Sequence, residues 1–195
     1  SADTIAMGDG TDRLLLNAAE VSLVGSAAQF SQVTGVEQIV VQDDANGENI
    51  NMNNLTGVTQ VEFDALVGAF TLTATSGSEL QFDAADNATD ARNFIVTGTG
   101  TSDSITLDIN GVDIGDGTQT FTGVETVNMA VSGTSVLDGA ITMTATAASE
   151  QIIITGTGTS FTTGNITADV VNASGYTGTF VTGTLQAATQ FSGSS

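Results

Sequence analysis

Short segments in which apolar and polar residues alternate recur along the chain, and glycine-rich turns separate them. Residues 104–109 read Ser-Ile-Thr-Leu-Asp-Ile, and residues 152–155 read Ile-Ile-Ile-Thr. Alternation with a period of two predicts strands with one buried face. Helical segments are scarce; residues 83–92 could form a short helix with Asp83, Asp86 and Asp90 on one solvated side. We therefore predict an all-β chain.

Two glycine phrases repeat. Thr-Gly-Val begins at Thr34, Thr56 and Thr122, the first two 22 residues apart and the third 66 further on, which is three times 22. Gly-x-Gly-Thr begins at Gly8, Gly98, Gly115 and Gly156. Short strands with a period near 20 residues are typical of a β-solenoid. We predict one elongated parallel β-solenoid domain over residues 1–195 with coils of about 20–22 residues. A β-sandwich whose turns use Thr-Gly is the alternative.

Within the first and third Thr-Gly-Val phrases, Glu37 and Glu125 occupy matching positions. Each precedes an apolar alternation, so we expect each to lie at a corner of a coil. We expect surface residues with equivalent structural roles there rather than metal ligands.

Charge divides the chain into two parts. Twenty-two Asp and Glu face two Arg and no Lys or His, for a net charge of -20, and 20 of the acids precede position 140. We therefore expect an acidic part at 1–139 and a weakly charged, Thr- and Gly-rich part at 140–195. Such self-repulsion must be screened or neutralised, and calcium is the cation that suits carboxylates in glycine-rich turns. The weakly charged part is either a surface that packs against another copy or a solvated Thr-rich face.

The calcium candidates lie in three glycine-rich segments. Two carboxylates flank Gly10, one follows Gly98-Thr-Gly100, and four oxygen-bearing side chains share residues 108–117 with three glycines. The last segment lacks the ligand spacing of an EF-hand, and an acidic turn with local Asx hydrogen bonds is its alternative. The predicted metal ligands are Asp9, Asp12, Asp103, Asp108, Asn110, Asp113 and Asp116.

The lack of His, Cys and Lys and the presence of only two Arg exclude several classes of function. Without His, Cys or Lys, a Ser-His triad, a cysteine nucleophile and a Schiff base are excluded, so we expect no enzyme. Nucleic-acid binding is excluded by the scarcity of basic residues. No apolar run is long enough to cross a bilayer, and the first residues lack the layout of a secretory signal. We expect Arg13 and Arg92 to pair with neighbouring aspartates.

The residues Gly8-Asp9-Gly10-Thr11-Asp12-Arg13-Leu14 match the end of the nonapeptide G-G-x-G-x-D-x-U-x, with Met7 at the first glycine. The segment resembles the RTX family of secreted calcium-binding β-roll proteins, and the resemblance implies that Gly8, Gly10 and Asp12 bind calcium between coils. Residues 122–128 and 152–159 are similar to phrases of RTX-related bacterial surface-layer proteins and large adhesins. This second resemblance implies export directed by the C-terminus and calcium-dependent assembly.

Together these features favour a secreted, cell-surface structural protein that self-assembles as a homo-oligomer or polymer into a layer or filament, with calcium at its acidic turns. An adhesin-type module that binds glycan or a cell surface is the alternative. A polysaccharide-active β-helix enzyme that uses a carboxylate pair is the third hypothesis.

Overall fold

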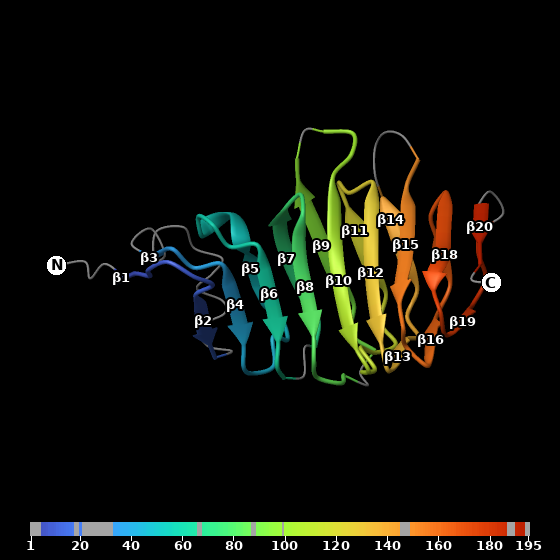
Figure 1. Cartoon of the computed structure of the whole chain (residues 1–195), viewed down its shortest axis with the longest axis horizontal. Coiled ribbons are helices and arrows are strands. Elements are labelled where there is room, and N and C mark those ends of the chain that lie inside the picture. Colours follow the sequence, from blue (N-terminus) through green and yellow to red (C-terminus); the bar gives the residue numbers. More distant parts are fainter. Residues whose placement is uncertain are drawn as a thin grey trace.

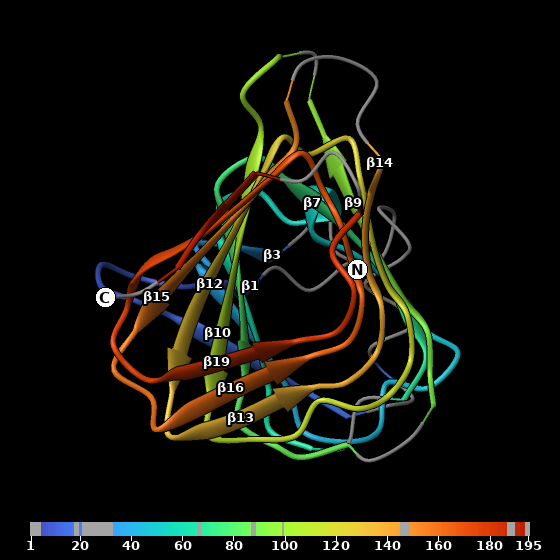
Figure 2. The same ribbon diagram turned by 90° about the vertical axis from the view of Figure 1, so that its right-hand side faces the viewer.

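The chain forms an elongated parallel β-solenoid with a roughly triangular cross-section (Figures 1 and 2). The computed structural model describes residues 5–17, 20, 33–65, 68–86, 89–98, 100–144, 149–186 and 190–193. All strand pairs among these residues are parallel. The predicted all-β solenoid is therefore confirmed, and the β-sandwich alternative is wrong because sandwiches are built from antiparallel strands.

One side of the triangle is a nine-stranded sheet that runs the length of the molecule and faces the viewer in Figure 1. Each coil contributes one strand to it. In spatial order the strands are β2 (Arg13–Leu16), β4 (Gln38–Val41), β6 (Gln60–Phe63), β8 (Ser78–Phe82), β10 (Ser104–Asn110), β12 (Thr126–Ser132), β15 (Gln151–Gly156), β18 (Val170–Tyr176) and β20 (Gln190–Ser192).

A six-stranded sheet forms the second side. Its strands are β5 (Asn49–Asn51), β7 (Phe70–Thr75), β9 (Arg92–Thr97), β11 (Gln119–Thr122), β14 (Ile141–Thr144) and β17 (Ile166–Thr167). A 3-10 turn, η2 (Met52–Asn54), follows β5. At the N-terminal end, β1 (Ile5–Ala6) pairs with β3 (Val33–Thr34).

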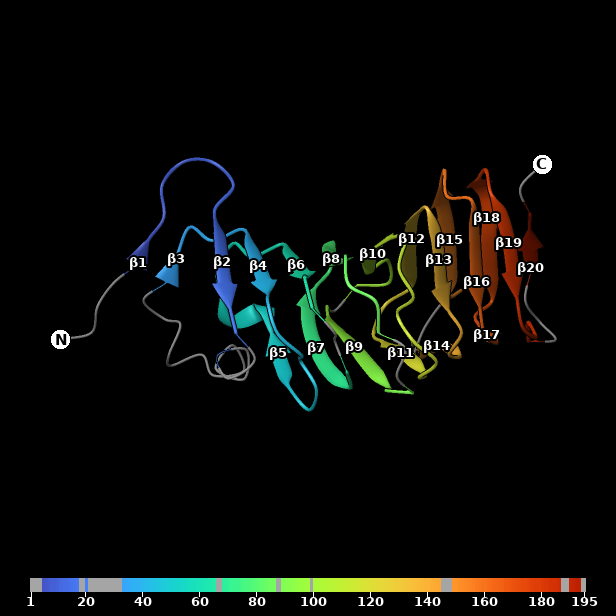
Figure 3. The same cartoon turned by 90° about the horizontal axis from the view of Figure 1, so that it is seen from below.

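The third side consists of turns in the N-terminal coils and of a β-sheet in the C-terminal coils. Towards the C-terminus it is a three-stranded sheet of β13 (Thr134–Leu137), β16 (Ser160–Thr163) and β19 (Thr179–Thr182), which lie side by side in Figure 3. In the N-terminal part, turns connect the nine-stranded sheet to the six-stranded sheet and occupy this side. Their described residues are 42–48, 64–65, 68–69, 83–86, 89–91 and 111–118, which contain nine Asp and Glu residues.

The coils differ in length more than the repeats predicted. Gln38 pairs with Gln60, 22 residues on, as the first two Thr-Gly-Val phrases indicated. Gln60 then pairs with Glu79 after only 19 residues, whereas Ser78 pairs with Ile105 after 27. The third phrase does lie three coils after the second, but the coils between are unequal because the turns differ in length.

Inward-facing residues stack into one hydrophobic core that extends from Leu16 to Tyr176. The registers place side chains of adjacent coils directly above one another, as with the fully buried Ile39, Val61 and Leu80. Phenylalanines do the same: the rings of Phe94 and Phe121 stack with centroids 4.8 Å apart. No coil could bury its apolar face alone, so stacking stabilises the fold.

The Thr-Gly-Val phrase forms the corner that enters the nine-stranded sheet. Its glycines all have positive φ, 71° at Gly35, 99° at Gly57 and 70° at Gly123, a conformation that favours glycine. The following valines are buried. A Cβ atom at Gly123 would lie 2.7 Å from the carbonyl oxygen of Val96 in the preceding coil. Glycine therefore allows the tight turn and the close approach of two coils.

Candidate metal site

Carboxylates at the corners link adjacent coils through the backbone. Glu37 Oε2 accepts a hydrogen bond of 2.9 Å from the N–H of Asp12, and Glu125 Oε2 accepts one of 2.8 Å from the N–H of Asp103. In return, the carbonyl oxygens of Asp12 and Asp103 accept the N–H groups of Glu37 and Glu125. Glu37 and Glu125 therefore lie at coil corners with equivalent structural roles, as expected, but the expectation of surface residues is wrong for Glu125, which is buried.

The same corner occurs again near the C-terminus, where Asp169 Oδ2 accepts the N–H of Glu150 at 3.1 Å. Each of these pairs satisfies a backbone N–H that a turn would otherwise leave without a partner. Among the predicted ligands, Asp12 and Asp103 thus have a clear structural role through their backbones, and Asp9 lies exposed in the turn before β2. Their role as metal ligands stays a prediction.

The structure separates the four predicted ligands of residues 108–117. Asp108 and Asn110 lie on the outer face of β10, in the nine-stranded sheet. Asp113 and Asp116 lie in the turn that follows, on the third side. Asp113 Oδ1 accepts the N–H of Gly115 at 2.9 Å, which is the Asx hydrogen bond expected of an acidic turn.

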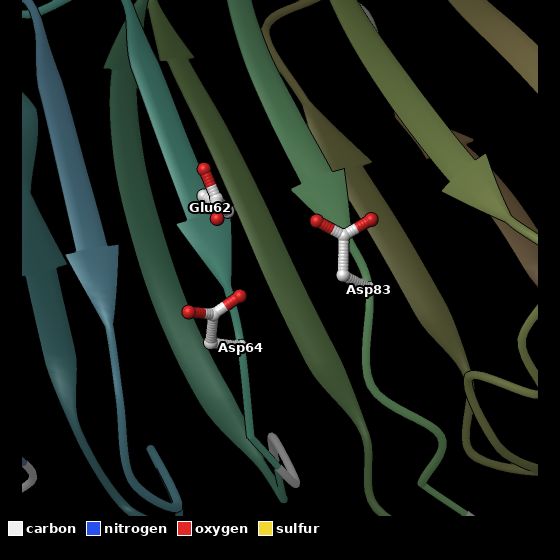
Figure 4. A group of neighbouring side chains, drawn as sticks. All are labelled: Glu62, Asp64 and Asp83. Carbon is white, nitrogen blue, oxygen red and sulfur yellow. The ribbon is translucent and has the colours of Figure 1, made fainter.

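Three carboxylates that the sequence analysis did not select meet beside Asp108. Oxygen atoms of Glu62, Asp64 and Asp83 all lie within 4.8 Å of one another. Glu62 is in β6, and Asp64 and Asp83 directly follow β6 and β8, so two adjacent coils supply the cluster (Figure 4). Three carboxylate groups at this separation are ligands of the kind that calcium prefers.

Glu62 is the buried member of the cluster, with 8% of its surface exposed. Arg13 Nη2 donates to both of its carboxylate oxygens, at 2.8 and 2.7 Å, and Gln38 Nε2 donates to Oε2. The expected partner of Arg13 was a neighbouring aspartate. That expectation is wrong, because stacking of the coils brings Glu62 to Arg13 across 49 residues of sequence.

Asp83 connects the cluster to the predicted ligands on β10. Its Oδ1 accepts a hydrogen bond of 2.7 Å from Asn110 Nδ2, and its Oδ2 accepts one of 2.6 Å from Gln81 Nε2. Asp108 is close enough that the charge of Asp83 affects its ionisation. Two of the seven predicted ligands, Asp108 and Asn110, therefore lie beside the carboxylate cluster.

Burial and like charge both oppose ionisation here. Burial raises the pKa of Glu62; Arg13 opposes this rise, whereas Asp64 and Asp83 add to it. Burial and the charge of Asp83 raise the pKa of Asp108, and a hydrogen bond from Asn110 opposes that rise. A bound cation would favour the charged forms instead.

A second acidic group lies on the third side. Burial raises the pKa of the Asp138 carboxyl, and the charges of Asp116 and Asp113 raise it further. Asp138 follows β13, one coil after the turn that holds the other two. Two predicted ligands thus lie near a third carboxylate, in a group separate from the Glu62 cluster.

The segment 83–92 is not a helix in its described residues, and its charges are not all solvated. Asp86 is 4% exposed and Arg92 is fully buried. Arg92 Nη2 donates to Asp86 Oδ2, its Nη1 to the carbonyl of Ile114, and its Nε to the carbonyl of Gly68 at 3.1 Å. The expected solvated face is wrong for Asp86, whereas the pairing of Arg92 with a neighbouring aspartate is confirmed. Arg92 thus joins its own coil, which also holds Asp86, to the preceding coil through Gly68 and to the following coil through Ile114.

Glu62, Asp64 and Asp83 could have been found from the alternation of the strands. In Gln60-Val-Glu62-Phe-Asp64 the polar residues share one face, and Asp83 has the same position relative to Phe82 that Asp64 has to Phe63. Their proximity, however, depends on the 19-residue coil between them, which the 22-residue repeat does not predict.

Comparisons of the chain with protein-family models, curated proteins and solved structures find no match. In the described part of the chain, no helix has the length and hydropathy to span a bilayer. The fold and the site therefore define the class: a parallel β-solenoid with carboxylate clusters on its N-terminal coils.

Proposed function

We propose that this chain is a calcium-stabilised structural domain of an extracellular surface layer or filament. The separation of charge along the solenoid carries the proposal. Twenty of the 22 acidic residues precede position 140, and many of them lie on the turns of the third side. The strands that form the same side further on, β13, β16 and β19, contain no charged residue.

Calcium would act at the Glu62, Asp64 and Asp83 cluster. These carboxylates come from two adjacent coils. Asp108 would add oxygen atoms from the next coil, and Asn110, whose amide nitrogen donates to Asp83, would do so after turning its amide. An ion held there would connect three coils and offset the mutual repulsion of the carboxylates. Partly exposed sites of this kind bind weakly and suit the calcium levels outside cells.

Copies would pack through the three-stranded sheet. Its outward residues form the uncharged rows Thr134, Ser160, Thr179 and Val136, Thr162, Val181, and Val181 is 49% exposed. Two molecules of charge -20 repel one another, so electrostatic repulsion is smallest when they approach through an uncharged side.

Electron microscopy of the protein with calcium and with chelator tests this function. We expect ordered sheets or filaments with calcium that disperse when calcium is removed. Thr162→Lys, in the middle of the proposed contact, should prevent assembly and keep calcium stabilisation. Thr106→Lys, on the outer face of β10, is the matched control and should assemble. A monomer in both conditions that is retained on a glycan surface would instead support the adhesin-type alternative.

A further inference from the structure

The outer face of the six-stranded sheet carries a regular array of threonine. Strand registers align the outward residues of successive coils into rows that cross the sheet. The first row is Asn49, Thr71, Asn93, Thr120, Thr142 and Thr167, and the second is Asn51, Thr73, Ile95, Thr122 and Thr144. Threonine occupies seven of the eleven positions in the two rows, and β9 interrupts both rows with Asn93 and Ile95.

The array has no charge, although the chain carries -20. The charged residue within these strands, Arg92, points inward and is fully buried. Inward Phe94 and Phe121 are also fully buried and stack on one another, so a close-packed layer supports the array from below. The strands thus present a neutral surface on a strongly acidic molecule, although a cavity lined by Glu48, Asn49, Thr71 and Asn93 interrupts one end of the first row.

The spacing of the array is set by the sheet. Parallel strands lie about 4.8 Å apart, and alternate residues along a strand lie about 6.6 Å apart. Threonine is stiff at χ1, so its hydroxyl and methyl positions repeat with the backbone. Thr71, Thr73 and Thr120 are half-buried on this face. The hydroxyls of Thr122 and Thr144 lie 3.1 Å apart and bond to each other.

Most other occupants fit this surface poorly. A second copy of this chain is the main competing occupant, and the variants below distinguish it from ice. An ionic mineral or a charged polymer would find no counter-charge on it. A neutral crystal of hydrogen-bonding molecules fits both the periodicity and the chemistry, and the lattice planes of ice have oxygen repeats close to these spacings.

We propose that the threonine array of the six-stranded sheet binds the surface of ice. The hydroxyls hydrogen-bond to water at lattice positions, and the methyl groups between them order the adjacent water rather than competing for it. This function is independent of the proposed calcium-dependent assembly, which uses the three-stranded sheet.

Ice-affinity partitioning and a recrystallisation assay with the wild-type protein in calcium test the proposal. We expect the protein to accumulate in slowly grown ice and to slow recrystallisation. Thr122→Tyr raises a bulky ring in the middle of the array and should abolish both effects. Thr106→Tyr, on the nine-stranded sheet, is the matched control and should retain them, with circular dichroism showing that both variants are folded.

Thr162→Lys separates the two functions, because it should stop assembly and leave ice retention intact. Exclusion of the wild-type protein from ice would overturn the proposal, as would equal losses in the two tyrosine variants. A pairing of copies in solution that Thr122→Tyr removes and Thr106→Tyr does not would also overturn it, since the array would then be a protein contact.

Discussion

Arg92→Met tests whether the buried ion pair fastens the coils. Methionine preserves much of the side-chain length and the contact with Phe70, whose ring lies 5.9 Å from the guanidinium carbon. The substitution removes the donors to Asp86 Oδ2 and to the carbonyls of Gly68 and Ile114. Its effect is therefore electrostatic and local to those three partners.

The expected cost follows from burial. Arg92 is fully buried and Asp86 is 4% exposed, and removing one partner of such a pair costs about 3–5 kcal/mol because the other charge is left buried. The two carbonyls that lose a donor add about 1 kcal/mol each. Whole domains are stable by about 5–15 kcal/mol, so this single change removes a large part of the total.

Urea denaturation followed by far-UV circular dichroism measures the free energy of unfolding. Arg92→Lys keeps the charge but cannot donate to all three partners at once, so its free energy of unfolding should lie between those of the wild type and Arg92→Met. Arg13→Met is the comparison variant: the Arg13 side chain is 47% exposed although that of its partner Glu62 is only 11% exposed, so its loss should cost less than the loss of Arg92, whose pair is buried on both sides. If Arg92→Met costs no more than Arg13→Met, the ion pair does not hold the coils together.

Three further predictions concern the carboxylates and the corners. The fold raises the pKa of Glu62 and Asp108 above their values in the unfolded chain, so without calcium the free energy of unfolding should fall as pH rises through the folded-state pKa values. Asp83→Asn should flatten this pH dependence, measured by urea denaturation at a series of pH values. An unchanged slope would contradict the role of Asp83 in raising these pKa values. Gly123→Ala places a Cβ atom 2.7 Å from the Val96 carbonyl oxygen at a position with positive φ, and it should lower the free energy of unfolding by about 1–3 kcal/mol. Gly57→Ala places its Cβ atom 3.6 Å from the nearest oxygen and should lower it by less in the same assay. Glu125→Ala leaves the N–H of Asp103 without its acceptor and should lower the unfolding free energy by about 1–3 kcal/mol, whereas a loss near zero would show that water replaces the carboxylate.

The local structure could be predicted from the sequence because it depends on neighbouring residues. Alternation identified strands such as β10 and β15, and the repeated Thr-Gly-Val phrase marked the corners at Gly35, Gly57 and Gly123. A glycine with positive φ followed by a buried valine is a local requirement, and it marks the entries into β4, β6 and β12.

The clusters could not be predicted because they depend on the length of each coil. A change of a few residues in a turn shifts every contact between coils, as the 19- and 27-residue coils show. The pairs Arg13–Glu62 and Asp83–Asn110 join residues 49 and 27 positions apart, neither of which is the 22-residue period. The predicted helix at 83–92 was wrong for a different reason, because Asp86 pairs with the buried Arg92 inside the solenoid rather than facing solvent.

The melting temperature of the protein with calcium and with chelator tests the central claim most directly. At a calcium concentration 100 times the dissociation constant, binding contributes about 2.7 kcal/mol, which corresponds to a rise of roughly 5–11 °C for a chain of this size. Asp83→Asn should lose most of this rise. Glu79→Gln, which neutralises one charge in β8 outside the cluster, should keep it. Equal melting temperatures with calcium and with chelator would contradict the account.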